Sequence, residues 1–164
     1  MKKLMLLLLE IFPFITLTSF SQAEKTTTAN NFPLNEKGEV VYTEIVKSDS
    51  TNYKELYVRA HVWFANTFNS AQNVVQLDDK DAGHIIGKGV FEFDETVMVV
   101  WVNFTIEIQT KDGKYKYTLS NFLYKGYRLE EITFDPSDIQ KINLKILNII
   151  DGLKKSMQTN TNNW

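Results

Sequence analysis

The sequence predicts a single α+β domain, in which an antiparallel sheet has two helices packed on one face, with the element order β-α-β-β-β-β-α. Three strand-like runs follow one another at about 85–93, 97–110 and 114–124, separated by short polar turns. Two other segments place apolar residues at helical spacing instead. Strands joined in series by short turns pair antiparallel, and helices segregated from them are typical of the α+β class.

The last two of these strands are expected to form a hairpin through Asp112-Gly113, a dipeptide favoured in type I′ turns. A two-residue loop places Lys111 opposite Lys114, so the numbers of paired residues sum to 225. In this register apolar residues face apolar residues. The even-numbered side of the strand 97–110 is therefore expected to face the core (Met98, Val100, Val102, Phe104, Ile106 and Ile108).

The same register makes one end of the sheet apolar on both faces, because it places Phe122 and Tyr124 beside Trp101 on the outer side. We therefore predict a contact surface there for a partner or ligand, with Lys88 at its edge (Val99, Trp101, Phe122, Tyr124 and Lys88). Two alternatives remain open. A β-bulge near Ser120-Asn121 would turn the two aromatic residues inward, or the leader or the segment after Gly126 would cover them.

A first strand is expected at 39–47, followed by a helix from about Asn52. Asn52 with Glu55 three residues later resembles a capping box. The helix has an apolar stripe (Tyr53, Leu56, Ala60, Trp63, Phe64, Phe68 and Ala71) and leaves Arg59 on its polar side. A short strand follows at 74–77.

The final helix is expected to open at Asp135-Pro136, with Asp135 as the cap and Pro136 at the first helical position. A regular apolar stripe then runs along it (Ile139, Ile142, Ile146, Ile149, Leu153 and Met157). Both helices can therefore bury one side against the sheet.

The N-terminus has the order of a secretory signal peptide: Lys2-Lys3, an apolar run from Leu4 that continues to Phe20, and small residues before a cleavage site. We expect residues 1–23 to be removed after Ala23, which leaves 141 residues with a net charge of −3 and no membrane span. The expected organisation is a flexible leader at 24–31, one domain at 32–157 and a flexible tail at 158–164. The predicted location is the periplasm or the exterior of a bacterium.

Composition excludes several classes of site. The chain has 164 residues and no Cys, so disulfide scaffolds, thiol nucleophiles and Cys-ligated metals are absent. A formal net charge of −2 gives no electrostatic reason to bind nucleic acid. We expect no metal and no cofactor, since His61 and His84 share no ligand motif.

The polar turn at 78–83 lacks the bidentate Glu of a calcium loop. Gly83, Gly87 and Gly89 lead into a strand rather than a helix, so they do not form a phosphate loop. We expect them to permit bulges or close backbone approach.

Several motifs in this order resemble an exported bacterial family, the "domain of unknown function with a TBP-like fold". The resemblance covers about Phe32 to Tyr127 and rests on Phe32-Pro33, Gly38–Tyr42, Glu55–Ala60 with Trp63-Phe64, Asp78–Gly83 with Ile85–Gly89, and Asp112–Tyr115. It implies a TBP-like fold, a curved antiparallel sheet with two helices on one face. It implies no catalytic residues, and TBP-like denotes a shape rather than DNA binding.

Three functions are compatible with these features. The first is a non-catalytic binding or accessory module of the bacterial envelope, whose partner is another protein, a copy of itself, or a lipid or other small apolar molecule. The second is a hydrolase-type enzyme acting on an envelope polymer or small molecule, with His84 and Asp79 or Asp81 as its acid–base groups. The third is a structural domain with no discrete ligand.

Overall fold

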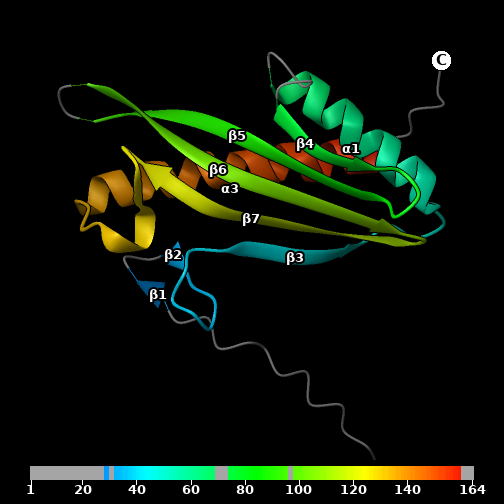
Figure 1. The fold of residues 1–164 in the computed structure, drawn as a ribbon, viewed down its shortest axis with the longest axis horizontal. Helices are drawn as coiled ribbons and strands as arrows, with labels where there is room; N and C mark the ends of the chain where they lie inside the picture. The colour runs from blue at the N-terminus through cyan, green and yellow to red at the C-terminus, as the bar shows by residue number, and fades with distance from the viewer. Residues whose placement is uncertain (1–27, 30–31, 69–73, 96–97, 160–164) are drawn as a thin grey trace, which may run out of the picture.

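The computed structural model describes residues 28–29, 32–68, 74–95 and 98–159. The expected signal peptide and most of the expected leader and tail lie outside the described residues. A sheet of antiparallel strands has the order β3-β7-β6-β5-β4 (Tyr42–Lys47, Lys114–Tyr124, Val99–Lys111, His84–Asp94 and Val75–Asp79). Helices α1 (Tyr53–Thr67) and α3 (Pro136–Gln158) lie against the same face of this sheet (Figure 1). The predicted α+β class is confirmed.

Four short elements were not expected from the sequence. β1 (Thr28–Ala29) pairs with β2 (Phe32–Pro33), so two residues of the expected flexible leader form part of a small ladder. β8 (Tyr127–Arg128) adds to the end of β7 and leads into the 3₁₀ helix η1 (Leu129–Glu131). The domain boundaries themselves stay a prediction.

The predicted hairpin register is confirmed, but the predicted turn type is wrong. Lys111 pairs with Lys114, and partner numbers sum to 225 as far as Thr105 and Ser120. A type I′ turn needs positive φ at both central residues, and here Gly113 has it (φ 74°) while Asp112 does not. The start of α1 explains the difference, because the Asp112 carboxylate accepts a 2.8 Å hydrogen bond from the Tyr53 amide.

Beyond Ser120 a β-bulge corrects our expectation for the outer surface. Asn103 pairs with Leu123 and Val102 with Tyr124, so β7 holds one extra residue and the partner numbers change parity. Asn121 absorbs the extra residue at φ 53°, a left-handed conformation that Asn tolerates better than most residues. Phe122 and Tyr124 therefore point into the core, where they are 1% and 8% exposed.

The core lies between the helices and the inner side of the three long strands. The even-numbered residues of β6 from Val100 to Ile108 are buried as predicted, whereas Met98 precedes the strand and is exposed. The expected close approach at two glycines is confirmed. A Cβ atom at Gly87 would lie 2.5 Å from the Phe64 ring, and one at Gly89 would lie 2.3 Å from the Phe104 ring.

The two helices are joined at one end by a buried cation. The expected cap of α1 is confirmed, since the Asn52 side chain accepts a 2.9 Å hydrogen bond from the Glu55 amide. Arg59, expected on the polar side, is instead buried: its Nε lies 3.1 Å from Glu55 Oε1, and its guanidinium donates to the Met157 carbonyl at 2.7 Å. Among the described residues, no helix is long and apolar enough to span a membrane.

Candidate functional site

We call the side of the sheet opposite α1 and α3 the outer face. Near the end of the long strands it carries four exposed apolar side chains, the outer patch, with exposed fractions from 37% to 59% (Val90, Val99, Trp101 and Leu123). The pairing makes the patch continuous. Val90 and Leu123 both lie opposite Asn103, from the two neighbouring strands, and Trp101 precedes Asn103 by two residues on the same face.

Only some residues of the predicted contact surface lie on the outer face. Val99 and Trp101 lie on the outer face in the predicted patch, and Lys88 is exposed on the same face. Phe122 and Tyr124 are core residues, which removes them from any contact surface. Two members of the outer patch were not predicted from the sequence: Val90, although it alternates with buried Phe91, and Leu123, which the bulge turns outward.

Acidic groups border the outer patch. Glu92 lies opposite Trp101 and Asp94 opposite Val99, and both are exposed. The buried Tyr124 ring reaches this border, where its hydroxyl donates to the Glu95 carboxylate. Burial, together with this carboxylate, raises the pKa of Tyr124, so the phenol stays a proton donor at neutral pH.

One corner of the opposite end of the outer face is basic. Four exposed lysines gather at the β6–β7 turn and the adjoining end of β3, and we call them the basic end (Lys47, Lys111, Lys114 and Lys116). Lys114 lies directly between Lys47 and Lys111 in the strand pairing. Within the part of the chain that the structure describes, none of the four forms an ion pair.

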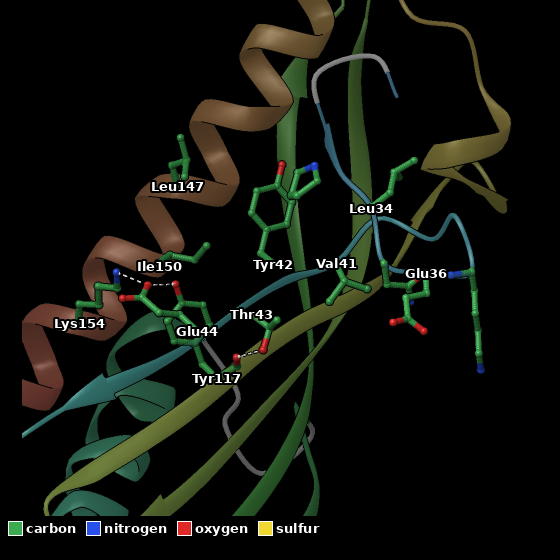
Figure 2. Close-up of a pocket in the computed structure, with 13 residues that line it drawn as sticks. Leu34, Glu36, Val41, Tyr42, Thr43, Glu44, Tyr117, Leu147, Ile150 and Lys154 are labelled. Atoms are coloured by element: carbon green, nitrogen blue, oxygen red, sulfur yellow. Dashed lines mark hydrogen bonds and ion pairs between the residues drawn. The ribbon is translucent and has the colours of Figure 1, made fainter. Parts of the chain in front are cut away.

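A groove of about 890 Å³ opens elsewhere, between β3, α3 and the turn at 35–38 (Figure 2). Its walls are mostly apolar (Pro33, Leu34, Val41, Tyr42, Leu147 and Ile150). One end is polar, since the Glu44 carboxylate accepts from Lys154 at 2.5 Å and from the Tyr117 hydroxyl at 2.8 Å. The hydrogen bond from Lys154 holds the pKa of Glu44 below its usual value, so the Glu44 carboxyl group is ionised at neutral pH.

The two histidines take part in ordinary paired contacts. His84 Nε2 lies 2.7 Å from Glu107 Oε1 on the outer face, and His61 Nε2 lies 2.9 Å from Asp78 Oδ1. His84 lines neither the groove nor the smaller cavity of about 130 Å³ at the basic end. The described residues hold no group of three or more potential metal ligands among His, Asp and Glu.

Two solved structures share this architecture. A TBP-like protein from Parabacteroides distasonis ATCC 8503 superposes with a TM-score of 0.67 at 15% identity, covering 78% of this chain and 97% of its own. A DUF4468 family protein from Bacteroides ovatus ATCC 8483 superposes with a TM-score of 0.61 at 16% identity, covering 80% of this chain and 94% of its own. At these identities the likeness establishes the fold alone.

Comparison with curated proteins finds no match. The family model described as "Domain of unknown function (DUF4468) with TBP-like fold" matches residues 42–125, more than half of the chain, from the edge strand β3 to the end of β7. This family indicates no catalytic class. The resemblance seen in the sequence is thus confirmed, and the protein belongs to the DUF4468 family of domains with a TBP-like fold.

Proposed function

We propose that the protein is a non-catalytic, exported binding module of the bacterial envelope that docks its outer patch onto a protein partner. The observation that carries this proposal is the exposure of Trp101, 59% on a sheet face that neither helix covers. Antiparallel sheets that face water on one side normally alternate apolar residues inward with polar residues outward. A Trp with three aliphatic neighbours on the water side departs from that rule.

The composition of the outer patch suits a protein surface. Trp supplies a large apolar area and one hydrogen-bond donor, and it is among the residues that most often dominate binding energy in interfaces. Val90, Val99 and Leu123 surround it with aliphatic area, while Glu92 and Asp94 form a polar rim. This arrangement of an apolar centre and a charged border matches the usual anatomy of protein interfaces.

The alternative function, a hydrolase-type enzyme, requires His84 to act with Asp79 or Asp81. His84 is instead paired with Glu107 and lines neither cavity, and the side chain of Asp79 accepts hydrogen bonds from the amides of Asp81 and Ala82 in its own turn. This arrangement favours a binding role over acid–base chemistry. The signal-peptide pattern at residues 1–23 supports the proposed export.

The test is photo-crosslinking in the producing bacterium, with a photoreactive amino acid at Asn103 inside the outer patch. We expect crosslinks to a defined protein that disappear in Trp101→Asp and persist in Leu144→Asp. Leu144 is a matched control because it is similarly exposed (58%) but lies on α3. Mass spectrometry of the purified protein should also give an N-terminus at Glu24. Crosslinks that persist in Trp101→Asp would refute the docking surface, and an uncleaved N-terminus would refute the export.

The groove supports a second candidate, the binding of an amphipathic small molecule. Its volume lies within the range of natural ligand pockets, and Leu147 is 52% exposed on its α3 wall. We expect the fluorescent probe anilinonaphthalene sulfonate to bind the protein and to lose affinity in Leu147→Arg. Val62→Arg, on exposed α1 surface, is the control. Equal probe binding by both variants would argue against a ligand in the groove.

A further inference from the structure

The two edge strands of the sheet differ in how well they could pair with another chain. β4, at one edge, holds five residues, has a register shift between Val75 and Leu77, and ends in Asp78 and Asp79. Irregularities and charges of this kind keep an edge strand from pairing with another strand. β3, at the other edge, pairs with β7 over all six residues without a shift and has the 64% exposed Ile45 near its centre (Figure 1). The β3 edge is therefore regular enough to accept a further strand.

Hydrogen bonds at both ends of β3 show which of its backbone groups face this edge. The Ser48 amide donates to the Gly113 carbonyl at 2.9 Å on the β7 side, and the Val41 amide donates to the Pro33 carbonyl at 3.0 Å on the other side. Neighbouring residues of an antiparallel strand direct their N–H and C=O groups to opposite sides. The odd-numbered residues of β3 therefore direct theirs away from β7 (Thr43, Ile45 and Lys47). Within the described part of the chain, these three N–H and three C=O groups form no hydrogen bond.

We propose that an extended segment of another protein adds to the β3 edge as a further strand. An extended polypeptide presents donors and acceptors at the spacing of these six backbone groups, so the edge itself specifies the class of its occupant. The chain already fills the position opposite Val41 in this way, because Pro33 pairs there. Room remains for a strand of about five residues opposite Thr43 to Lys47. This site is separate from the outer patch, and it gives the groove an occupant different from the small molecule considered above.

The groove of about 890 Å³ runs beside the β3 edge and would receive one side of the added strand. Directly paired residues lie on the same face of a sheet, so the residue opposite Glu44 would project toward α3, as Glu44 itself does when it binds Lys154 (Figure 2). The α3 wall of the groove carries Leu147, which is 52% exposed, and Ile150. We therefore expect the partner to place an apolar side chain at this position.

Charge selects the residue at the other end of the added strand. Lys111, Lys114 and Lys47 lie directly opposite one another on three neighbouring strands, and like charges in such positions destabilise a sheet. β4, which bears Asp79, lies at the opposite edge of the sheet. The partner residue opposite Lys47 would be the fourth in this row, so an Asp or Glu there would offset the repulsion. The recognised segment is therefore extended, apolar opposite Glu44 and acidic opposite Lys47.

The experiment selects peptides from a phage-displayed library of random twelve-residue sequences on the protein purified from the producing bacterium. We expect the selected peptides, measured by fluorescence anisotropy, to bind Ile45→Pro at least about tenfold more weakly than the wild type. Pro removes one N–H from the free edge and places its ring in the path of the added strand. The sheet keeps its hydrogen bonds, because the Ile45 N–H faces away from β7 and Pro is tolerated at such edge positions. Ile45→Val keeps the N–H and is the matched control, which should bind like the wild type.

Two further comparisons test the pairing and the charge. A peptide N-methylated at a residue whose N–H faces β3 should lose binding, whereas one N-methylated at the next residue should keep it; both use the wild-type protein, so they do not depend on how Ile45→Pro folds. Selection on Lys47→Glu should replace the acidic residue of the peptides by a basic one. Lys145→Glu makes the same charge change on exposed α3 surface and should select the same peptides as the wild type.

Three results would overturn this inference: no selected peptides, peptides that bind Ile45→Pro as tightly as the wild type, or binding that is indifferent to the position of the N-methyl group. A wild type that sediments as a dimer and becomes monomeric in Ile45→Pro would assign the edge to a second copy of this chain and would also overturn it. Circular dichroism verifies that each variant keeps its fold. The Trp101-dependent crosslinks from Asn103 test the proposed function separately, because Ile45 lies outside the outer patch.

Discussion

Replacing Gly89 with Ala tests how tightly the sheet packs against its own aromatic core. A Cβ atom at this position would lie 2.3 Å from Cζ, 2.5 Å from Cε1 and 3.0 Å from Cε2 of Phe104, so the ring itself must move. Phe104 is 2% exposed and stacks on Phe122 with ring centroids 5.9 Å apart, while the Phe91 ring centroid lies 6.0 Å away. A shift of the Phe104 ring therefore disturbs its contacts with these two rings.

Overpacking of this kind typically costs 1–3 kcal/mol, and the approach of less than 3 Å at Gly89 places the expected loss at about 2 kcal/mol. For a domain of this size such a loss lowers the melting temperature by about 6–8 °C. Urea unfolding followed by circular dichroism measures the change in free energy directly. We expect the midpoint to fall without a change in slope, because one added methyl group hardly changes the surface that is exposed on unfolding.

Gly152→Ala is the matched control, because its Cβ atom would lie an ordinary 3.7 Å from Trp63 Nε1 and would sit inside α3. Ala is favoured over Gly in a helix by up to about 1 kcal/mol, so this variant should be more stable than the wild type. Combining Gly89→Ala with Phe104→Leu should cost less than the two single changes together, because the smaller side chain makes room for the methyl group. A Gly89→Ala protein as stable as the wild type would refute the packing argument.

Three further changes test contacts away from the sheet interior. Arg59→Met should lower the free energy of unfolding by about 2–3 kcal/mol in urea titration, because the buried carbonyl of Met157 loses its charged donor; an unchanged midpoint would show that the contact is dispensable. Asn52→Ala should cost about 1 kcal/mol in the same assay through loss of the α1 cap, whereas an effect near zero would contradict the cap. Because the hydrogen bond from Lys154 lowers the pKa of folded Glu44, this carboxylate stabilises the fold above its unfolded pKa and the contribution is lost as pH falls through the folded value. Glu44→Gln should therefore flatten part of the stability loss between neutral and acidic pH in thermal melts, and a profile parallel to the wild type would refute the pairing.

Local patterns were enough to predict most of the architecture. The Asp112-Gly113 turn fixed the register of the longest hairpin, and helical spacing located both helices, because each signal acts over a few neighbouring residues. The predicted turn type was wrong because of a tertiary contact: the start of α1 binds the turn through Asp112. The prediction that Arg59 lies on the polar side of its helix was wrong for the same kind of reason, because the carbonyl group that Arg59 binds lies 98 residues away in the sequence.

The candidate site was harder to predict because it depends on one backbone conformation and on distant segments. The bulge at Asn121 decides which of Phe122 and Leu123 faces water, and an Asn in a strand does not reveal from sequence whether it adopts positive φ. The groove could not be predicted from the sequence, because its walls come from the turn at 35–38, from β3 and from α3. No short motif can report a contact between segments about a hundred residues apart.

The bulge also bears on why Trp101 of the outer patch stays exposed. By turning Phe122 and Tyr124 inward it satisfies the core, so the fold has no packing use for Trp101, which stays 59% exposed. At the other end of the same face, lysines on neighbouring strands lie directly opposite one another, which destabilises the sheet. Trp101 and the adjacent lysines both lie on the sheet face that the helices leave open, and the proposed docking surface rests on these two observations.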